Sequence, residues 1–171
     1  DAFRELIAAH LAGQVPEVAS LMHELTDLLY VAYNAMWTFG VHPDPIFAEV
    51  HRANLSKAGG PRRADGKLLK PLGWKPADVA NIINKMGNGI PINDDPKTNA
   101  EKIVEFHEQI GSPLPTQPVL PTLESVALRQ KLIDEEYAEV TAVYQEILPA
   151  QKAGRTPDFS TLMHELADLL Y

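Results

Sequence analysis

The sequence has no cysteine among its 171 residues, which excludes disulfide bonds and metal sites built on thiolates. It also has no apolar run long enough to span a bilayer and no recognisable signal peptide. A chain without cysteine is compatible with a reducing compartment. From these absences we expect a soluble, cytoplasmic protein that does not act at a membrane.

Positive charge is scarce as well. The chain has 15 Lys and Arg against 23 Asp and Glu, which gives a formal net charge of −8. Because this excess of negative charge repels a phosphate backbone, we expect no nucleic-acid partner. The length is sufficient for one domain with a sizeable core.

The dominant signal along the chain is helical periodicity, and no segment shows the alternation of a strand. Pro16, Asp44 with Pro45, and Pro76 are predicted helix starts, and Thr98 begins a predicted capping box. The fold class is therefore all-α, most simply a helical bundle. The predicted helices are 1–12, 16–39, 44–57, 76–87, 98–111, 122–148 and a last one from about 159 to 171.

The sequence contains an internal repeat. Residues 21–30 (LMHELTDLLY) return at 162–171 (LMHELADLLY), with nine of ten positions identical at a constant offset of 141. Upstream, residues 1–6 align with 135–140 at an offset of 134. The chain therefore carries two copies of a helix pair.

The second copy has five carboxylates at helical spacing. Glu135, Glu136 and Glu139 share one helix face, and Glu165 and Asp168 lie three residues apart on the next helix. If the two helices are antiparallel, all five acids surround one cavity. Carboxylates among leucines are costly unless they are paired, and hard oxygen ligands favour Mg²⁺ or Mn²⁺ over zinc. The alternative is that the first three acids form a solvated helix face.

The first copy keeps fewer of these acids. Glu5, Glu24 and Asp27 are retained, as is an acid at Asp1, but Ala2 stands where the second copy has a glutamate. One complete site and one degraded second site is the simplest interpretation.

A second informative stretch is a basic loop, residues 57–75. It has six basic residues and one acid, Asp65. Because the chain is acidic overall, a Gly-rich loop that gathers cations is suited to hold an anion such as phosphate. A loop that is merely solvated is the alternative.

Three histidines lie near these groups. His23 and His164 are inside the repeats, and we expect them to contact the acids or solvent instead of ligating a metal. His51, which precedes Arg52 and Asn54, is a candidate to face a substrate.

The acid pattern resembles a known signature. Glu135-Glu136-x-x-Glu139 followed by Glu165-x-x-Asp168 is similar to the EExxE…ExxD signature of the all-α nucleoside triphosphate pyrophosphohydrolases. This superfamily includes MazG, the dimeric dUTPases and phosphoribosyl-ATP pyrophosphohydrolase.

Other segments resemble the MazG-like branch of that superfamily. Residues 47–57 (FAEVHRANLSK) and 65–71 (DGKLLKP) are most similar to Deinococcus MazG-like enzymes that act on dUTP. The likeness covers nearly the whole chain in rotated order, so that the family's C-terminal part comes first. We expect one intertwined all-α domain in which residues 1–87 and 98–171 are joined by a polar linker, 88–97.

The resemblance implies hydrolysis between the α and β phosphates of a nucleoside triphosphate, with dUTP or another deoxypyrimidine nucleotide as substrate. It also implies Mg²⁺, with Mn²⁺ as a substitute, and a homodimer or higher homo-oligomer. The implied roles are metal ligation by Glu136, Glu139, Glu165 and Asp168, orientation or deprotonation of water by Glu135, and phosphate binding by Asn54, Lys57, Lys67 and Lys70.

A function of another class remains open. The altered first copy is compatible with a non-catalytic helical module, for binding or regulation, whose carboxylates hold a structural metal ion.

Overall fold

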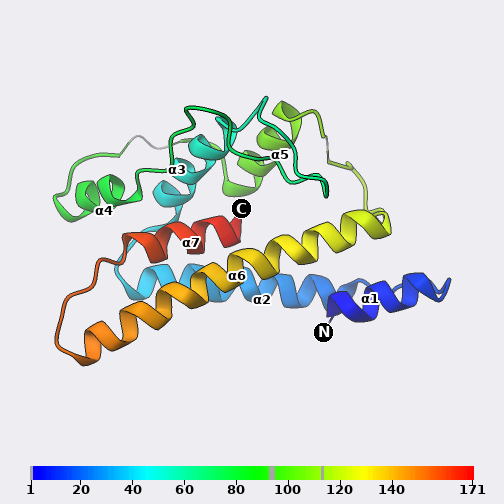
Figure 1. Cartoon of the computed structure of the whole chain (residues 1–171), viewed down its shortest axis with the longest axis horizontal. Helices are drawn as coiled ribbons and strands as arrows, with labels where there is room; N and C mark the ends of the chain where they lie inside the picture. Colours follow the sequence, from blue (N-terminus) through cyan, green and yellow to red (C-terminus); the bar gives the residue numbers. More distant parts are fainter. Residues whose placement is uncertain (1, 93–94, 113) are drawn as a thin grey trace.

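The structure, a computed structural model, describes residues 2–92, 95–112 and 114–171, and within these residues it has seven α-helices and no strand (Figure 1). An isolated bridge joins Arg62 and Leu68. None of the helices in the described part is long and apolar enough to cross a membrane. The predicted all-α class is confirmed. The helices are α1 (Ala2–Leu11), α2 (Ala19–Thr38), α3 (Pro43–Leu55), α4 (Val79–Gly87), α5 (Asn99–Gln109), α6 (Leu123–Lys152) and α7 (Ser160–Leu170).

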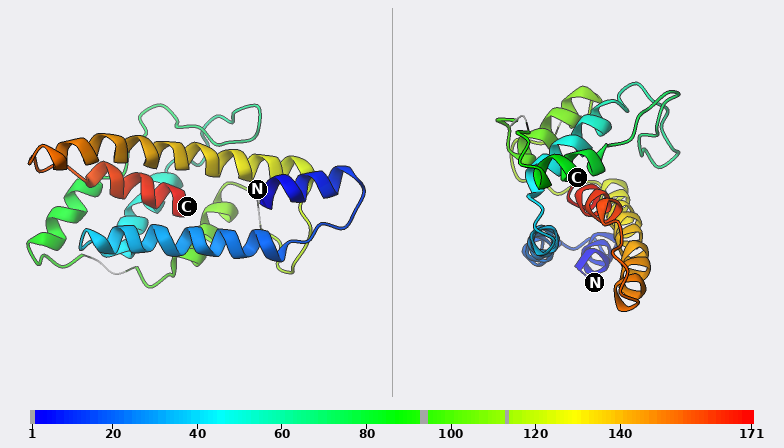
Figure 2. Two further views of the ribbon diagram at one scale, coloured as in Figure 1. Left: turned by 90° about the horizontal axis from the view of Figure 1, so that it is seen from below. Right: turned by 90° about the vertical axis from the view of Figure 1, so that its left-hand side faces the viewer.

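Helix α7 is at the centre of the molecule. It contacts α6, α3, α2 and α4, and Figures 1 and 2 show it between the layer of α3, α4 and α5 and the layer of α1 and α2. The long helix α6 runs antiparallel to α7 along its side. Elements from the two ends of the sequence therefore pack on one another. The division into 1–87, 88–97 and 98–171 stays a prediction, and residues 93–94 of that linker lie outside the described residues.

The hydrophobic core surrounds α7. Its residues Leu162, Met163, Leu166 and Ala167 are at most 3% exposed. Burial of apolar area on this scale is the main force that holds α7 in place. The core residues that other helices contribute include Ala32, Met36, Ile46, Val50, Val79, Ile82, Val140 and Ile147.

The two copies of the repeat lie in different environments. Met163 on α7 is fully buried, whereas the equivalent Met22 on α2 is 52% exposed. Tyr171 is partly buried, whereas Tyr30 is 70% exposed. Nearly the same ten residues therefore form a core helix in one place and a surface helix in the other.

The single difference between the copies matches their environments. Ala167 is fully buried. Its counterpart Thr26 is exposed, and the threonine hydroxyl donates a hydrogen bond to the Met22 carbonyl at 2.8 Å. A threonine at position 167 would add a methyl group and a hydroxyl to a packed core, which is destabilising.

Two helices begin at residues other than those predicted. The first residue of α2 is Ala19 and not Pro16, and the Glu17 carboxylate accepts hydrogen bonds from amides of the first turn at 2.6 and 3.1 Å. The predicted N-cap Asp44 lies inside α3, whose N-cap is His42. In both cases a side chain that accepts from the first free amides sets the helix start.

Two further boundaries also differ. Helix α4 begins after its N-cap Asp78 and not at Pro76. Helix α6 continues past the predicted end at Leu148, through Pro149, to Lys152. A proline deprives a helix of one amide donor. Ile147 and Ala150, on either side of Pro149, are buried, and their packing stabilises the helix beyond the proline.

Candidate functional site

Three carboxylates from α6 and α7 meet at one point. Among the described residues, the acids close enough to one another to share a metal ion are Glu136, Glu139 and Glu165, whose oxygens lie within 4.8 Å of one another. Glu136 and Glu139 share a face of α6 because they are three residues apart. Antiparallel packing of α7 on α6 brings Glu165 to the same place.

The fourth predicted ligand, Asp168, lies outside that triad. It lines a cleft together with two members of the triad, Glu136 and Glu139. Its Oδ2 is 3.2 Å from Nε2 of His164, one turn earlier on α7. The hydrogen bond to Asp168 raises the pKa of His164. As predicted, His164 contacts an acid.

The triad concentrates negative charge in a partly buried place. Burial, together with the proximity of Glu139, raises the pKa of Glu165 to about 7. Burial, together with the charge of Asp168, also raises the pKa of Glu136. Raised pKa values of neighbouring carboxylates indicate that nearby cations do not fully compensate their negative charge. A divalent cation would provide further compensation.

These pKa shifts predict how metal binding depends on pH. A carboxyl whose folded pKa is raised ionises first in the unfolded chain. The free energy of unfolding without metal therefore falls as pH rises from the ordinary glutamate range to about 7 for Glu165. Metal binding requires ionised ligands and removes their repulsion. We expect Mg²⁺ to raise Tm, relative to EDTA, more at about pH 8 than at about pH 6. Equal increments at the two pH values would contradict this.

The predicted phosphate-binding residues lie around the same cleft. Its volume is about 530 Å³, and Asn54, Lys57, Lys67 and Lys70 line it together with three acids, Glu136, Glu139 and Asp168. Asn54 lies near the end of α3 and is buried, whereas the basic loop supplies the three lysines. The structure thus places carboxylates and lysines around one space.

Trp74 orients two of these lysines. The ammonium groups of Lys57 and Lys70 lie 5.5 and 4.5 Å from the centre of its ring, at cation–π distance. The indole nitrogen donates to the Ala53 carbonyl at 2.8 Å, which fixes the ring on α3. Burial lowers the pKa of Lys57. An anion in the cleft would therefore meet lysines whose positions are restricted.

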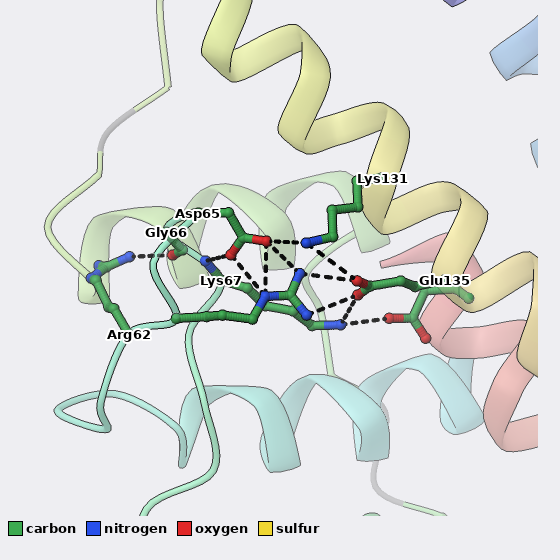
Figure 3. A network of polar contacts seen from close by, with 8 residues as sticks. Arg62, Asp65, Gly66, Lys67, Lys131 and Glu135 are labelled. Carbon is green, nitrogen blue, oxygen red and sulfur yellow. Dashed lines mark hydrogen bonds and ion pairs between the residues drawn. The ribbon is translucent and has the colours of Figure 1, made fainter.

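Glu135 is bound by the basic loop (Figure 3). Its Oε2 accepts a hydrogen bond from Lys67 at 2.7 Å, and its Oε1 lies 3.0 Å from a guanidinium nitrogen of Arg63. The hydrogen bond from Lys67 and then that from Arg63 lower the pKa of Glu135. Lys67 also lies 3.4 Å from Glu136. Lys67 thus links Glu135 to the acid triad.

The acids of the first copy lie at the surface. Glu5, Glu24 and Asp27 are exposed, and Asp27 is 3.4 Å from His23. Asp1 lies outside the described residues. None of these three acids belongs to the metal-compatible group found among the described residues. That the first copy is a degraded site stays a prediction.

The sequence made His51 a candidate to face a substrate, but His51 is not among the residues that line the cleft. It is 4% exposed, and its Nδ1 lies 3.1 Å from the Tyr171 hydroxyl. Its Nε2 lies 3.1 Å from Glu105, which in turn pairs with Lys97 at 2.7 Å. Burial lowers the pKa of His51. His51 therefore holds Tyr171, and it is Tyr171 that lines the cleft.

The cleft is also lined by residues that were not among the predicted site residues. They come from α5, α6 and the last residue of the chain. In the sequence, the adjacent rings of Phe106 and His107 were a signal for this part of the cleft. Adjacent rings also occur in helices that only pack in a core, so the signal is not specific. The residues are Ile103, Phe106, His107, Leu128, Leu132 and Tyr171.

A comparison with protein families matches residues 2–54 and 103–171 to the phosphoribosyl-ATP pyrophosphohydrolase family. Each matched segment contains one copy of the repeated helix pair, and the basic loop and α4 fall between the two segments. No curated protein matches the sequence closely enough to count as a relative. Because the match covers well over half of the chain, the protein belongs to the phosphoribosyl-ATP pyrophosphohydrolase family.

Proposed function

We propose that this protein is a metal-dependent pyrophosphohydrolase that cleaves a nucleoside triphosphate between its α and β phosphates. The observation that supports this most is the triad Glu136, Glu139 and Glu165, of which Glu136 and Glu139 line a cleft that loop lysines also line. A polyphosphate with its divalent cation is a ligand that satisfies both sets of charges. Membership of the family implies a nucleotide pyrophosphohydrolase activity.

Mg²⁺, with Mn²⁺ as a substitute, fits the donor set. Carboxylate oxygens are the ligands that these ions prefer, at about 2.1 Å for Mg²⁺. The oxygens of Glu136, Glu139 and Glu165 lie within 4.8 Å of one another, close enough to share one ion. We assign ligation to Glu136, Glu139, Glu165 and Asp168. When bound, such an ion polarises the phosphoryl group and helps to ionise the attacking water.

The protein's own groups have separate tasks in this proposal. In the reaction, a water oxygen bonds to the α-phosphorus, and the bond from that phosphorus to the bridging oxygen breaks. We assign orientation of the water to Glu135, because its ion pairs keep it a carboxylate that accepts hydrogen bonds. Asn54, Lys57, Lys67 and Lys70 bind the phosphates and stabilise the departing pyrophosphate.

For the substrate we propose dUTP. The basic loop falls between the matched segments, so the family match does not extend to the part of the chain that supplies the lysines. The proposal rests on the likeness of residues 47–57 and 65–71 to MazG-like enzymes that act on dUTP. The rings of Phe106 and Tyr171, which line the cleft, provide a surface for a base.

A substrate panel tests this choice. We expect kcat/KM for dUTP to exceed that for dCTP, dTTP and the purine nucleotides by at least about tenfold, because unpaired polar groups make wrong bases costly to bury. Phosphoribosyl-ATP belongs in the same panel at equal Mg²⁺. A preference for phosphoribosyl-ATP, or similar rates for all substrates, would reject dUTP but leave the pyrophosphohydrolase itself supported.

The alternative of a non-catalytic module with a structural ion gives a different result in the same experiment. Such a module would be stabilised by Mg²⁺ without releasing pyrophosphate from any nucleotide.

We also propose that the protein acts as a homodimer or a higher homo-oligomer. Helix α2 exposes Tyr30, Val31 and Trp37, each by more than half of its surface. Large apolar side chains grouped on one surface helix are typical of association sites.

A further inference from the structure

A compact set of ion pairs connects the basic loop to α6. Asp65 is at its centre: its carboxylate accepts two hydrogen bonds from Arg63, both at 2.8 Å, and one from Lys131 of α6 at 2.5 Å (Figure 3). The Lys67 amide also donates to Asp65, at 3.3 Å. The only acid of the loop thus joins two loop residues to a helix that lies far away in the sequence.

The second acid of this set of ion pairs is Glu135, which lies one turn after Lys131 on α6. Lys131 lies 3.9 Å from Glu135, and Arg63 and Lys67 also contact it, at 3.0 and 2.7 Å. Three cations therefore share two acids, Asp65 and Glu135. Asp65 pairs with Arg63 and Lys131, and Glu135 pairs with all three cations.

The loop has a second attachment on its far side. Arg62 donates to the Gly66 carbonyl at 3.1 Å and to the Ile110 carbonyl, just after α5, at 3.0 Å. The turn of residues 62–68 therefore has fixed points on α5 and on α6. Apart from one bridge the turn has no regular secondary structure, so side-chain contacts determine where it lies.

We infer that Asp65 and Lys131 are positioning residues that hold the loop so that Lys67 lies beside Glu136 at the acid triad. This inference rests on the proposed function, because it concerns how the phosphate-binding Lys67 reaches its place. Neither residue lines the cleft, and both act through Lys67. Single exposed ion pairs contribute little, but a network of several pairs on one loop can decide its position.

The expected effect follows from the fraction of molecules whose loop is in place. A lower fraction weakens the apparent affinity for the polyphosphate in proportion, and it leaves the chemical step of the bound complex nearly unchanged. Asp65→Asn should therefore raise KM by about tenfold and change kcat by no more than about twofold. Lys131→Met should act in the same direction, and Lys131→Arg should retain wild-type values. The double variant Asp65→Asn/Lys131→Met should be impaired by less than the sum of the two single effects, since both changes remove the Asp65–Lys131 contact.

The matched control is Asp134→Asn, which removes an exposed acid on α6 next to Glu135. Two readouts do not depend on turnover. Calorimetry measures the affinity for inorganic pyrophosphate with Mg²⁺, which should fall about tenfold in Asp65→Asn and not in the control. Trypsin cleavage after Arg62, Arg63 and Lys67 reports whether the loop opens. It should be faster in Asp65→Asn than in the control.

The possible outcomes separate the two proposals. If the wild-type protein releases no pyrophosphate, the proposed function fails, and pyrophosphate affinity still decides the inference. If Asp65→Asn matches Asp134→Asn in KM, pyrophosphate affinity and cleavage rate, the inference is overturned. Faster cleavage with unchanged affinity also overturns it, because the contact would then hold the loop without positioning Lys67.

Discussion

Glu136→Gln is expected to lower kcat for pyrophosphate release by about a thousandfold or more, because it removes an anionic ligand where charge develops in the transition state. The side chain keeps its size and the neighbouring helices keep their packing. Circular dichroism should therefore show unchanged helix content. Without metal the Tm should not fall, since the substitution removes a partly buried charge whose pKa is raised.

The control for this experiment is Glu146→Gln, which neutralises an exposed glutamate on the same helix. It should leave kcat within about twofold of the wild type. Near-normal turnover of Glu136→Gln at saturating Mg²⁺ would remove the triad from the proposed mechanism.

The second large effect distinguishes the two copies of the repeat. Glu165→Gln should lower kcat/KM by about a hundredfold or more, whereas the equivalent change Glu24→Gln should leave it within about twofold. The reason is their surroundings: Glu165 meets two glutamates of α6, and Glu24 is exposed on α2.

Both variants carry the same chemical change in nearly the same ten-residue sequence, so each is the control for the other. Equal losses of activity would show that the first copy also takes part in catalysis, or that the two copies build one shared site.

Local spacing was enough to predict much of the fold and part of the site. The capping box of Thr98 and Glu101 is confirmed, with both reciprocal hydrogen bonds present. The meeting of Glu136 and Glu139 with Glu165 followed from three-residue spacing and from a short connector between two helices. These features depend on residues that are close in sequence or on adjacent helices.

The remaining features depend on contacts that spacing does not encode. Lys131 and Asp65 are 66 residues apart, and Tyr171 and His51 are 120 residues apart. Nothing in the loop sequence indicates which helix its acid will reach. The burial of His51 likewise depends on α5 and α7 packing over α3.

The repeat also has a consequence for how the chain folds. Tyr171 packs against Phe47 and Phe106, with ring centroids 5.5 and 5.3 Å apart, and thus occupies a cradle made by α3 and α5. Tyr30 belongs to an almost identical segment of α2, and the short connector 39–42 joins the end of α2 to α3. Closing that short loop costs less entropy than bringing in α7 from the other end of the chain. The nearer copy is thus a kinetic competitor for the cradle, and the native arrangement has the higher contact order.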